Sequence, residues 1–124
     1  MLKFFDADDF KGTASIYESH ITFNKPLLVY MQDSYRVRVG ADTENRVAYV
    51  FLYDKDKALN GEIKPSSLLS LSVSKTYCRI CSRSLVDYLR ELYGFDIKEK
   101  SFVRFKARYD EAKRCVVIDL KEAI

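Results

Sequence analysis

The chain of 124 residues is 48% hydrophobic and 31% charged, with a formal net charge of +3. This composition is that of an ordinary globular protein and argues against a disordered chain. The length suffices for one domain, or two intertwined half-domains, whose core needs no disulfides. The first nine residues hold only short apolar stretches beside three acids, so we expect no signal peptide, no membrane association and a cytoplasmic location. Three cysteines, an odd number, do not make a secreted disulfide framework.

The chain begins with an acidic segment, residues 1–13, that we expect to form a peripheral strand or N-terminal arm. Residues 15–23 then alternate polar and apolar side chains, which predicts a half-buried strand. Lys25 and Pro26 predict the start of a short helix, because a proline in the first turn loses no helical hydrogen bond.

A first hairpin is expected next. Residues 35–39 and 46–52 read as its two strands, and the second is apolar on both faces, as a central strand should be. Residues 54–68 contain alternating charges, an Asn-Gly pair and a proline, and this pattern predicts a connector.

The second half of the chain opens with another alternating segment, residues 72–80, which predicts a single strand. Ser82 should cap the N-terminus of a helix, and Gly94 should end it in a left-handed conformation. Four apolar side chains spaced by three, four and seven residues are expected on the buried face of this helix: Leu85, Tyr88, Leu89 and Leu92.

A second hairpin is expected at the C-terminal end. In residues 103–109, apolar side chains alternate with Arg104, Lys106 and Arg108, which predicts a strand with one apolar and one cationic face. After a polar turn, residues 114–118 are rich in β-branched side chains and predict a more deeply buried strand.

The order of strand, helix and hairpin therefore occurs twice. Residues 15–23 match 72–80 at an offset of 57, and residues 42–52 match 110–120 at an offset of 68. The larger second offset means that the first copy lacks about one helical turn. Arg36 then corresponds to Arg104, and Arg38 corresponds to Lys106.

We predict a β-rich α+β fold made of two strand-helix-hairpin repeats. The expected organisation is an arm at 1–13, a first repeat at 14–53, a connector at 54–68 and a second repeat at 69–124.

Residues 72–120 resemble the SpoVT/AbrB-like swapped-hairpin family. The likeness lies in Cys78-Arg-Ile-Cys-Ser-Arg-Ser-Leu85, in Leu89, in Gly94-Phe95 and in the hairpin that follows. In that family two units interlock their hairpins into a small barrel, and many members are DNA-binding transition-state regulators or antitoxins. The resemblance implies a pseudo-twofold barrel within one chain, existing as a monomeric pseudo-dimer or a homodimer. It also implies a prokaryotic or phage transcription regulator that contacts mainly the DNA backbone.

The resemblance also implies a set of contact residues. Lys75 and Arg79 stand where the family carries cations on its first strand, and Arg83 stands near the helix start; Glu18 and Thr22 occupy the positions that match Lys75 and Arg79 in the first repeat. Together with the strand cations, the candidate nucleic-acid-binding residues are Lys75, Arg79, Arg83, Arg104, Lys106, Arg108, Arg36 and Arg38.

The cationic strands have a simpler interpretation as solvated faces, because outward Lys and Arg also protect sheet edges. The charge distribution favours polyanion contact in the second half of the chain. Residues 67–124 hold twelve basic and eight acidic side chains, whereas residues 1–66 hold nine basic and ten acidic side chains. The acidic first half favours the alternative function, a protein-interaction module such as a phage or mobile-element inhibitor or antitoxin. No acid, base and nucleophile converge in the sequence, so we do not expect an enzyme.

Cys78, Cys81, Cys115 and His20 match the ligand count of a zinc site, but no second Cys-x-x-Cys motif is present. We therefore expect core thiols and a histidine that fills space, with no metal and no cofactor.

Two groups of aspartates could suggest cation or carboxylate sites. Asp42 and Asp110 match each other in the repeat, but both lie in turns, where an aspartate caps its own backbone. Asp6, Asp8 and Asp9 could hold a weak cation, although a solvated acidic arm is the simpler interpretation.

Overall fold

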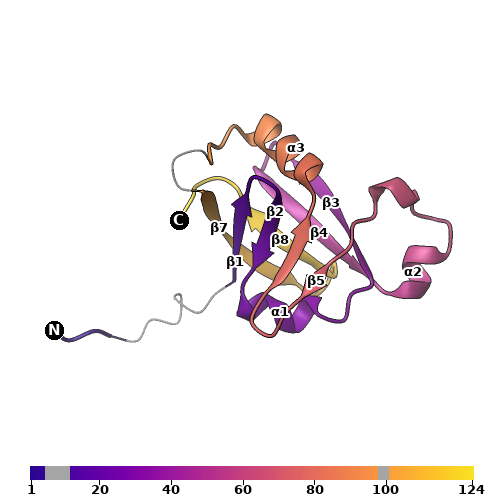
Figure 1. Ribbon diagram of the computed structural model, residues 1–124, viewed down its shortest axis with the longest axis horizontal. Helices are drawn as coiled ribbons and strands as arrows, with labels where there is room; N and C mark the ends of the chain where they lie inside the picture. Colours follow the sequence, from indigo (N-terminus) through magenta and orange to yellow (C-terminus); the bar gives the residue numbers. More distant parts are fainter. Residues whose placement is uncertain (5–11, 98–100) are drawn as a thin grey trace.

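The computed structural model describes residues 1–4, 12–97 and 101–124 (Figure 1). Its strands are β1 (Thr13–Tyr17), β2 (His20–Phe23), β3 (Arg36–Asp42), β4 (Val47–Tyr53), β5 (Ser72–Val73), β6 (Cys78–Cys81), β7 (Phe102–Asp110) and β8 (Cys115–Asp119). Its helices are α1 (Lys25–Met31), α2 (Lys55–Leu59), the short 3-10 helix η2 (Pro65–Ser67) and α3 (Arg83–Tyr93).

The strands form one curled, half-barrel sheet in the order β3-β4-β8-β7-β1-β2-β6-β5. Every strand pairing in the described residues is antiparallel. The first half of β7 pairs with β1 and its second half pairs with β8, so this strand joins the two halves of the sheet. Val37 and Leu69 exchange two backbone hydrogen bonds, which link β3, at one end of the sheet, to the segment just before β5, at the other. The β-rich α+β expectation is confirmed.

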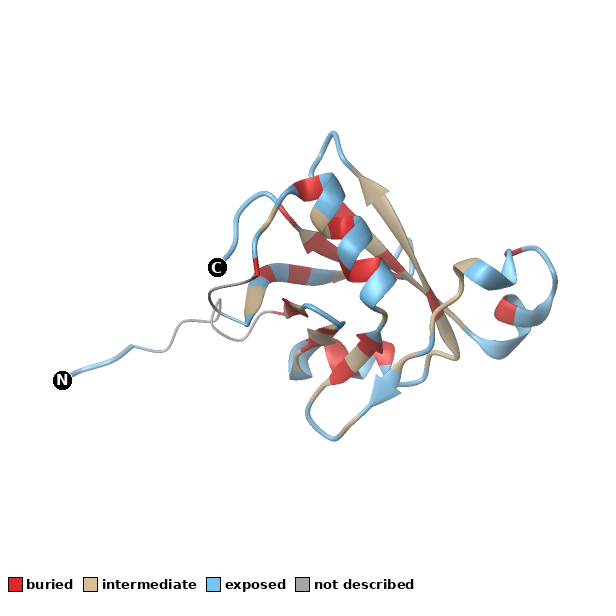
Figure 2. Cartoon of the chain, turned by 45° about the horizontal axis from the view of Figure 1, so that its top comes forward, coloured by how far each residue is buried: buried red, intermediate tan, exposed pale blue. Residues whose placement is uncertain are grey.

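Alternation along each strand sorts the side chains onto two faces. The inner face, with α1 and α3, forms the main core (Figure 2). In the view of Figure 1, α3 lies above the strands and α1 lies below them. The fully buried side chains on the inner face include Ile16, Ile21, Phe23, Val37, Val50, Ile80, Val116 and Ile118. Each such side chain contributes about 1.5–3 kcal/mol by leaving water, so the fold is held together mainly from within.

Both segments predicted as single strands are hairpins. Residues 15–23 run along β1, reverse at Glu18 and Ser19, and return along β2. Residues 72–80 contain β5 and most of β6, joined by a turn in which the Ser74 amide donates to the Tyr77 carbonyl at 2.9 Å. Alternation does not reveal so short a reversal, because the polar residues of the turn continue the polar positions of the strands.

Helix α3 begins and ends as predicted. The Ser82 hydroxyl accepts a hydrogen bond from the Leu85 amide at 3.1 Å, and Gly94 has a left-handed φ of 72°. The predicted buried face is partly wrong, because Tyr88 and Leu92 are 50% and 38% exposed. The side chains that α3 buries are Leu85, Val86, Leu89 and Tyr93.

Contacts of Tyr93 explain why α3 buries a face different from the predicted one. Its hydroxyl donates a 2.7 Å hydrogen bond to the carbonyl of Val47, and the Arg46 guanidinium donates to the Tyr93 carbonyl at 2.9 Å. These contacts fix the C-terminal turn of α3 to the start of β4, so the helix presents Val86 to the core in place of Tyr88.

The two long hairpins close with the same turn. Asp42 accepts a hydrogen bond from the Asn45 amide at 3.2 Å, and Asp110 accepts one from the Lys113 amide at 3.3 Å. The residues that follow these turns share a left-handed φ: Arg46 (52°) and Arg114 (51°). The interpretation of both aspartates as turn residues is confirmed, and hydrogen bonds from Asn45 lower the pKa of Asp42.

The connector is more ordered than predicted. Asp54 caps α2 by accepting a hydrogen bond from the Lys57 amide at 2.8 Å, and η2 follows at the proline. The proposed cation ligands Asp6, Asp8 and Asp9 lie outside the described residues. Among the helices that the structure describes, none has the length and apolar character needed to cross a membrane.

Candidate nucleic-acid interface

The cationic side of β7 is the starting point of the candidate site. Arg104, Lys106 and Arg108 are exposed, and they alternate with the buried Phe105 and Ala107. The predicted division of this strand into one apolar and one cationic face is confirmed. Similar side chains along one face lie roughly 6.6–7 Å apart.

The register of the sheet brings β3 onto the same face. Arg108 lies opposite Val117 on β8, and Val117 lies opposite Tyr49 on β4. Further along β4, Phe51 faces Arg38 and Tyr53 faces Arg36.

The other half of the sheet adds Arg79 to this face. Arg104 pairs with Ser15, Ser15 pairs with Thr22, and Thr22 pairs with Arg79. Cross-strand partners share a face of the sheet, so Arg79 lies on the outer face too.

Six of the eight predicted cations therefore share the outer face of the sheet. We call this set the outer cationic face: Arg36, Arg38, Arg79, Arg104, Lys106 and Arg108. Lys75 and Arg83 are not brought to it, because Lys75 lies in the turn between β5 and β6 and Arg83 is the first residue of α3.

Aromatic rings hold several of these cations in place. The guanidinium of Arg38 lies 5.6 Å from the ring centre of Tyr53, and that of Arg104 lies 5.1 Å from the ring centre of Phe102. Further pairs of this kind are Arg36 with Tyr35 at 4.3 Å, Arg79 with Tyr77 at 5.4 Å and Lys113 with Tyr49 at 5.3 Å. Such contacts orient a cation without neutralising it.

Within the described residues, no ion pair joins a carboxylate to the outer cationic face. The ion pairs found in the described part of the chain join Lys57 to Glu62 at 3.2 Å and Lys121 to Asp119 at 4.0 Å. Neither contains a member of the outer cationic face. The polar contacts that its members do make include one from Arg104 Nε to the Ser15 hydroxyl at 3.1 Å.

A groove of about 870 Å³ follows β7. Arg104, Lys106, Arg108 and Lys121 contribute four cations to its lining, and Asp119 contributes one carboxylate. A hollow with this excess of positive charge suits an extended polyanion.

Sequence reasoning missed the aromatic component of this face. Tyr49, Phe51 and Tyr53 alternate with Val50 and Leu52 along β4, and this alternation could have separated the two faces. The apolar composition of the segment instead predicts burial on both faces. On the outer face, Tyr49 and Phe51 pack over a small second cluster made of Val47, Cys115 and Val117.

A second group of rings lies where β1, β2 and β7 meet. His20 stacks on Tyr17 with ring centres 4.4 Å apart, and Tyr17 contacts Phe102 at 5.2 Å. Burial, with a smaller contribution from the charge of Arg79, lowers the pKa of His20. The histidine packs among rings, as expected for a residue that fills space.

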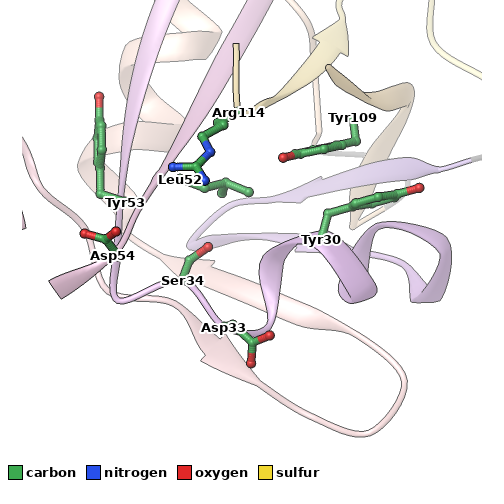
Figure 3. A pocket seen from close by; sticks show the side chains of 8 residues that line it. All are labelled: Tyr30, Asp33, Ser34, Leu52, Tyr53, Asp54, Tyr109 and Arg114. Atoms are coloured by element: carbon green, nitrogen blue, oxygen red, sulfur yellow. The ribbon is translucent and has the colours of Figure 1, made fainter. Parts of the chain in front are cut away.

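A smaller pocket of about 210 Å³ lies beside the stacked rings of Tyr30 and Tyr109, whose centres are 4.2 Å apart (Figure 3). Arg114 supplies one cation to its lining, while Asp33 and Asp54 supply two carboxylates. These charges do not extend the outer cationic face, because carboxylates repel a polyanion.

The cysteines do not converge. Cys78 faces the core and Cys81 is exposed, so the two thiols of the Cys-x-x-Cys sequence point to opposite faces of β6. The core-thiol interpretation is confirmed for Cys78 and Cys115 and is wrong for Cys81. In the described residues, no group of three or more His, Cys, Asp or Glu side chains is placed to hold a metal ion.

Comparison with known proteins finds no relative: no family model matches the chain, and no match was found among curated proteins or solved structures.

Proposed function

We propose that the chain is a DNA-binding regulator of the AbrB-like type that contacts mainly the phosphate backbone through the outer cationic face. The observation that carries the proposal is the convergence of six cations on one face beside a groove, with no ion pair to a carboxylate among the residues that the structure describes. Phosphate contacts of this kind supply most of the affinity of non-specific nucleic-acid binding.

The order of elements supports an AbrB-like repeat. Two strands, a helix and two strands occur first as β1, β2, α1, β3 and β4, and then as β5, β6, α3, β7 and β8. In this comparison β2 is equivalent to β6, and β4 is equivalent to β8. Each of these pairs lies side by side, β4 with β8 in the middle of one half of the sheet and β2 with β6 in the middle of the other. Strand β7 of the second unit pairs with β1 of the first, as exchanged hairpins require.

The strand register supports the same symmetry. Thr22 faces Arg79, and these residues are separated by the first repeat offset of 57. Tyr49 faces Val117, and these are separated by the second offset of 68. A twofold axis relating the repeats would pass through both pairs, since residues related by such an axis meet only where it crosses the sheet.

The affinity for duplex DNA should fall steeply with salt. If six cations contact phosphates, the logarithm of the affinity should decrease against the logarithm of salt concentration with a slope of about −5. The variant with Arg104→Gln, Lys106→Gln and Arg108→Gln should make that slope shallower by about 3. Fluorescence anisotropy with a labelled duplex measures both.

A matched control neutralises three exposed lysines that do not belong to the outer cationic face. Lys55→Gln, Lys57→Gln and Lys64→Gln change the net charge equally, but these lysines belong to α2 and the segment after it. The control should keep nearly all of the affinity. An equal loss in both triple variants would mean that net charge, and not the outer cationic face, attracts DNA.

A protein-interaction module is the second candidate function. It is favoured by exposed apolar side chains on the helices, Val29 at 61% on α1 and Tyr88 at 50% on α3, together with the acidic first half of the sequence. A stoichiometric protein partner recovered without nucleic acid would select this function over DNA binding.

A further inference from the structure

The outer face of the sheet carries rings as well as cations. Tyr49 and Phe51 lie on β4, between the arginines of β3 and, across β8, the cations of β7. On the other side of β7, Phe102 continues into the ring group of Tyr17 and His20. The cations of β7 therefore have partly exposed rings on both sides.

An unkinked duplex does not offer its base faces to such rings. Its bases are stacked within the helix, so a protein surface that does not force them apart reaches only phosphates, sugars and base edges. A single strand exposes its base faces, and proteins bind these faces by stacking them on aromatic side chains or on guanidinium planes. The guanidinium of Arg104 over the Phe102 ring offers both kinds of surface at one position.

We propose that the outer face binds single-stranded nucleic acid in preference to duplex, with bases stacked on Phe51 and Phe102 and phosphates held by Arg104, Lys106 and Arg108. This inference rests on the proposed function for its phosphate contacts, and it adds the class of nucleic acid. Phe51 pairs with Cys115, and Cys115 pairs with Asp110 at the far end of β7 from Phe102. The two rings are therefore separated by two strand spacings of roughly 4.8 Å each across the sheet and by roughly 26 Å along β7. The three cations of β7 lie along that length, so a single strand that runs along β7 can reach both rings.

Rings on this face also have a structural role that the experiment must separate from binding. Phe51 shields the cluster around Cys115 and Val117 from water. The variant Phe51→Leu keeps an apolar cover and removes the aromatic surface, whereas Phe51→Tyr keeps the aromatic surface and should restore binding.

The experiment compares three labelled probes of about 20 units, oligothymidylate, oligouridylate and a mixed-sequence duplex. Wild-type protein should bind at least one single strand more tightly than the duplex. Phe51→Leu combined with Phe102→Leu should weaken single-strand binding on the order of 10- to 100-fold. The salt slope and the duplex affinity should stay unchanged, because no phosphate contact is lost.

A matched control is Tyr88→Leu, which removes an exposed ring from α3, away from the outer face. It should leave binding of all three probes unchanged, and circular dichroism should show that every variant is folded. Tighter binding of the duplex, or unchanged single-strand binding in the double variant, overturns this inference and leaves phosphate contact intact. Failure to bind any probe at low salt overturns both proposals.

Discussion

At the scale of single residues, burial separates the three cysteines. Desolvation raises the pKa of Cys78 to about 12, and its thiol donates to the sulfur of Met31 at 3.5 Å. Burial also raises the pKa of Cys115, whereas Cys81 is exposed at the end of β6. Because the thiolate is the reactive form, the sequence motif Cys-x-x-Cys does not act as a pair here.

We therefore predict that one thiol of the folded protein reacts quickly with a disulfide reagent at pH 8. Cys81 should account for that fast phase, while Cys78 and Cys115 should react only at the rate of unfolding or local opening. Absorbance of the released thiolate measures the phases. Cys81→Ser should abolish the fast phase, and a fast phase that persists in this variant would contradict the burial of the other two thiols.

At the scale of elements, helix ends were predictable and helix faces were not. Ser82 and Gly94 act through local backbone geometry, so they could be identified from sequence alone. The buried face of α3 depends on the contact between Tyr93 and β4, which lies 46 residues away in the chain. The reversals within residues 15–23 and 72–80 were missed because alternation persists through their turns.

Tyr93→Phe tests the link between α3 and β4. The change removes the hydroxyl and leaves the Val47 carbonyl without this buried partner, so we expect the free energy of unfolding to fall by about 1–2 kcal/mol. Urea denaturation followed by circular dichroism measures the loss. Tyr88→Phe is the control, because its exposed side chain should lose almost nothing. Equal stability of the two variants would show that the Tyr93 hydrogen bond contributes little.

At the scale of the whole molecule, the cations of the candidate site could be predicted from the sequence, but most of its rings could not. The alternation of Arg104, Lys106 and Arg108 is a local pattern, and it predicts a cationic strand face without knowledge of the neighbouring strands. The same alternation places Phe102 on that face, because it lies two residues before Arg104 on β7. The ring of Phe51 could not be assigned to it, because which strands lie beside β7 depends on pairings between segments far apart in the chain. Long-range register is the information that a single sequence does not display.

The same long-range pairing predicts how the two halves depend on each other. Strand β7 takes its partner β1 from the first half, and β8 takes β4, so a fragment of residues 69–124 leaves both with unpaired edges. We expect no folded monomer of this fragment. It should be unfolded alone, or fold as a homodimer in which a second copy supplies the equivalent strands.

Sedimentation and circular dichroism of the fragment, with and without residues 1–68, distinguish these outcomes. Mixing the fragments should restore β-sheet signal with the mass of one complete chain, because β2 and β4 then regain β6 and β8 as neighbours. A homodimer of 69–124 would favour the repeat interpretation, since equivalent strands can replace each other only if the units share one fold. A folded monomer would mean that the second half closes on itself, and the exchange of hairpins would then not be needed for stability.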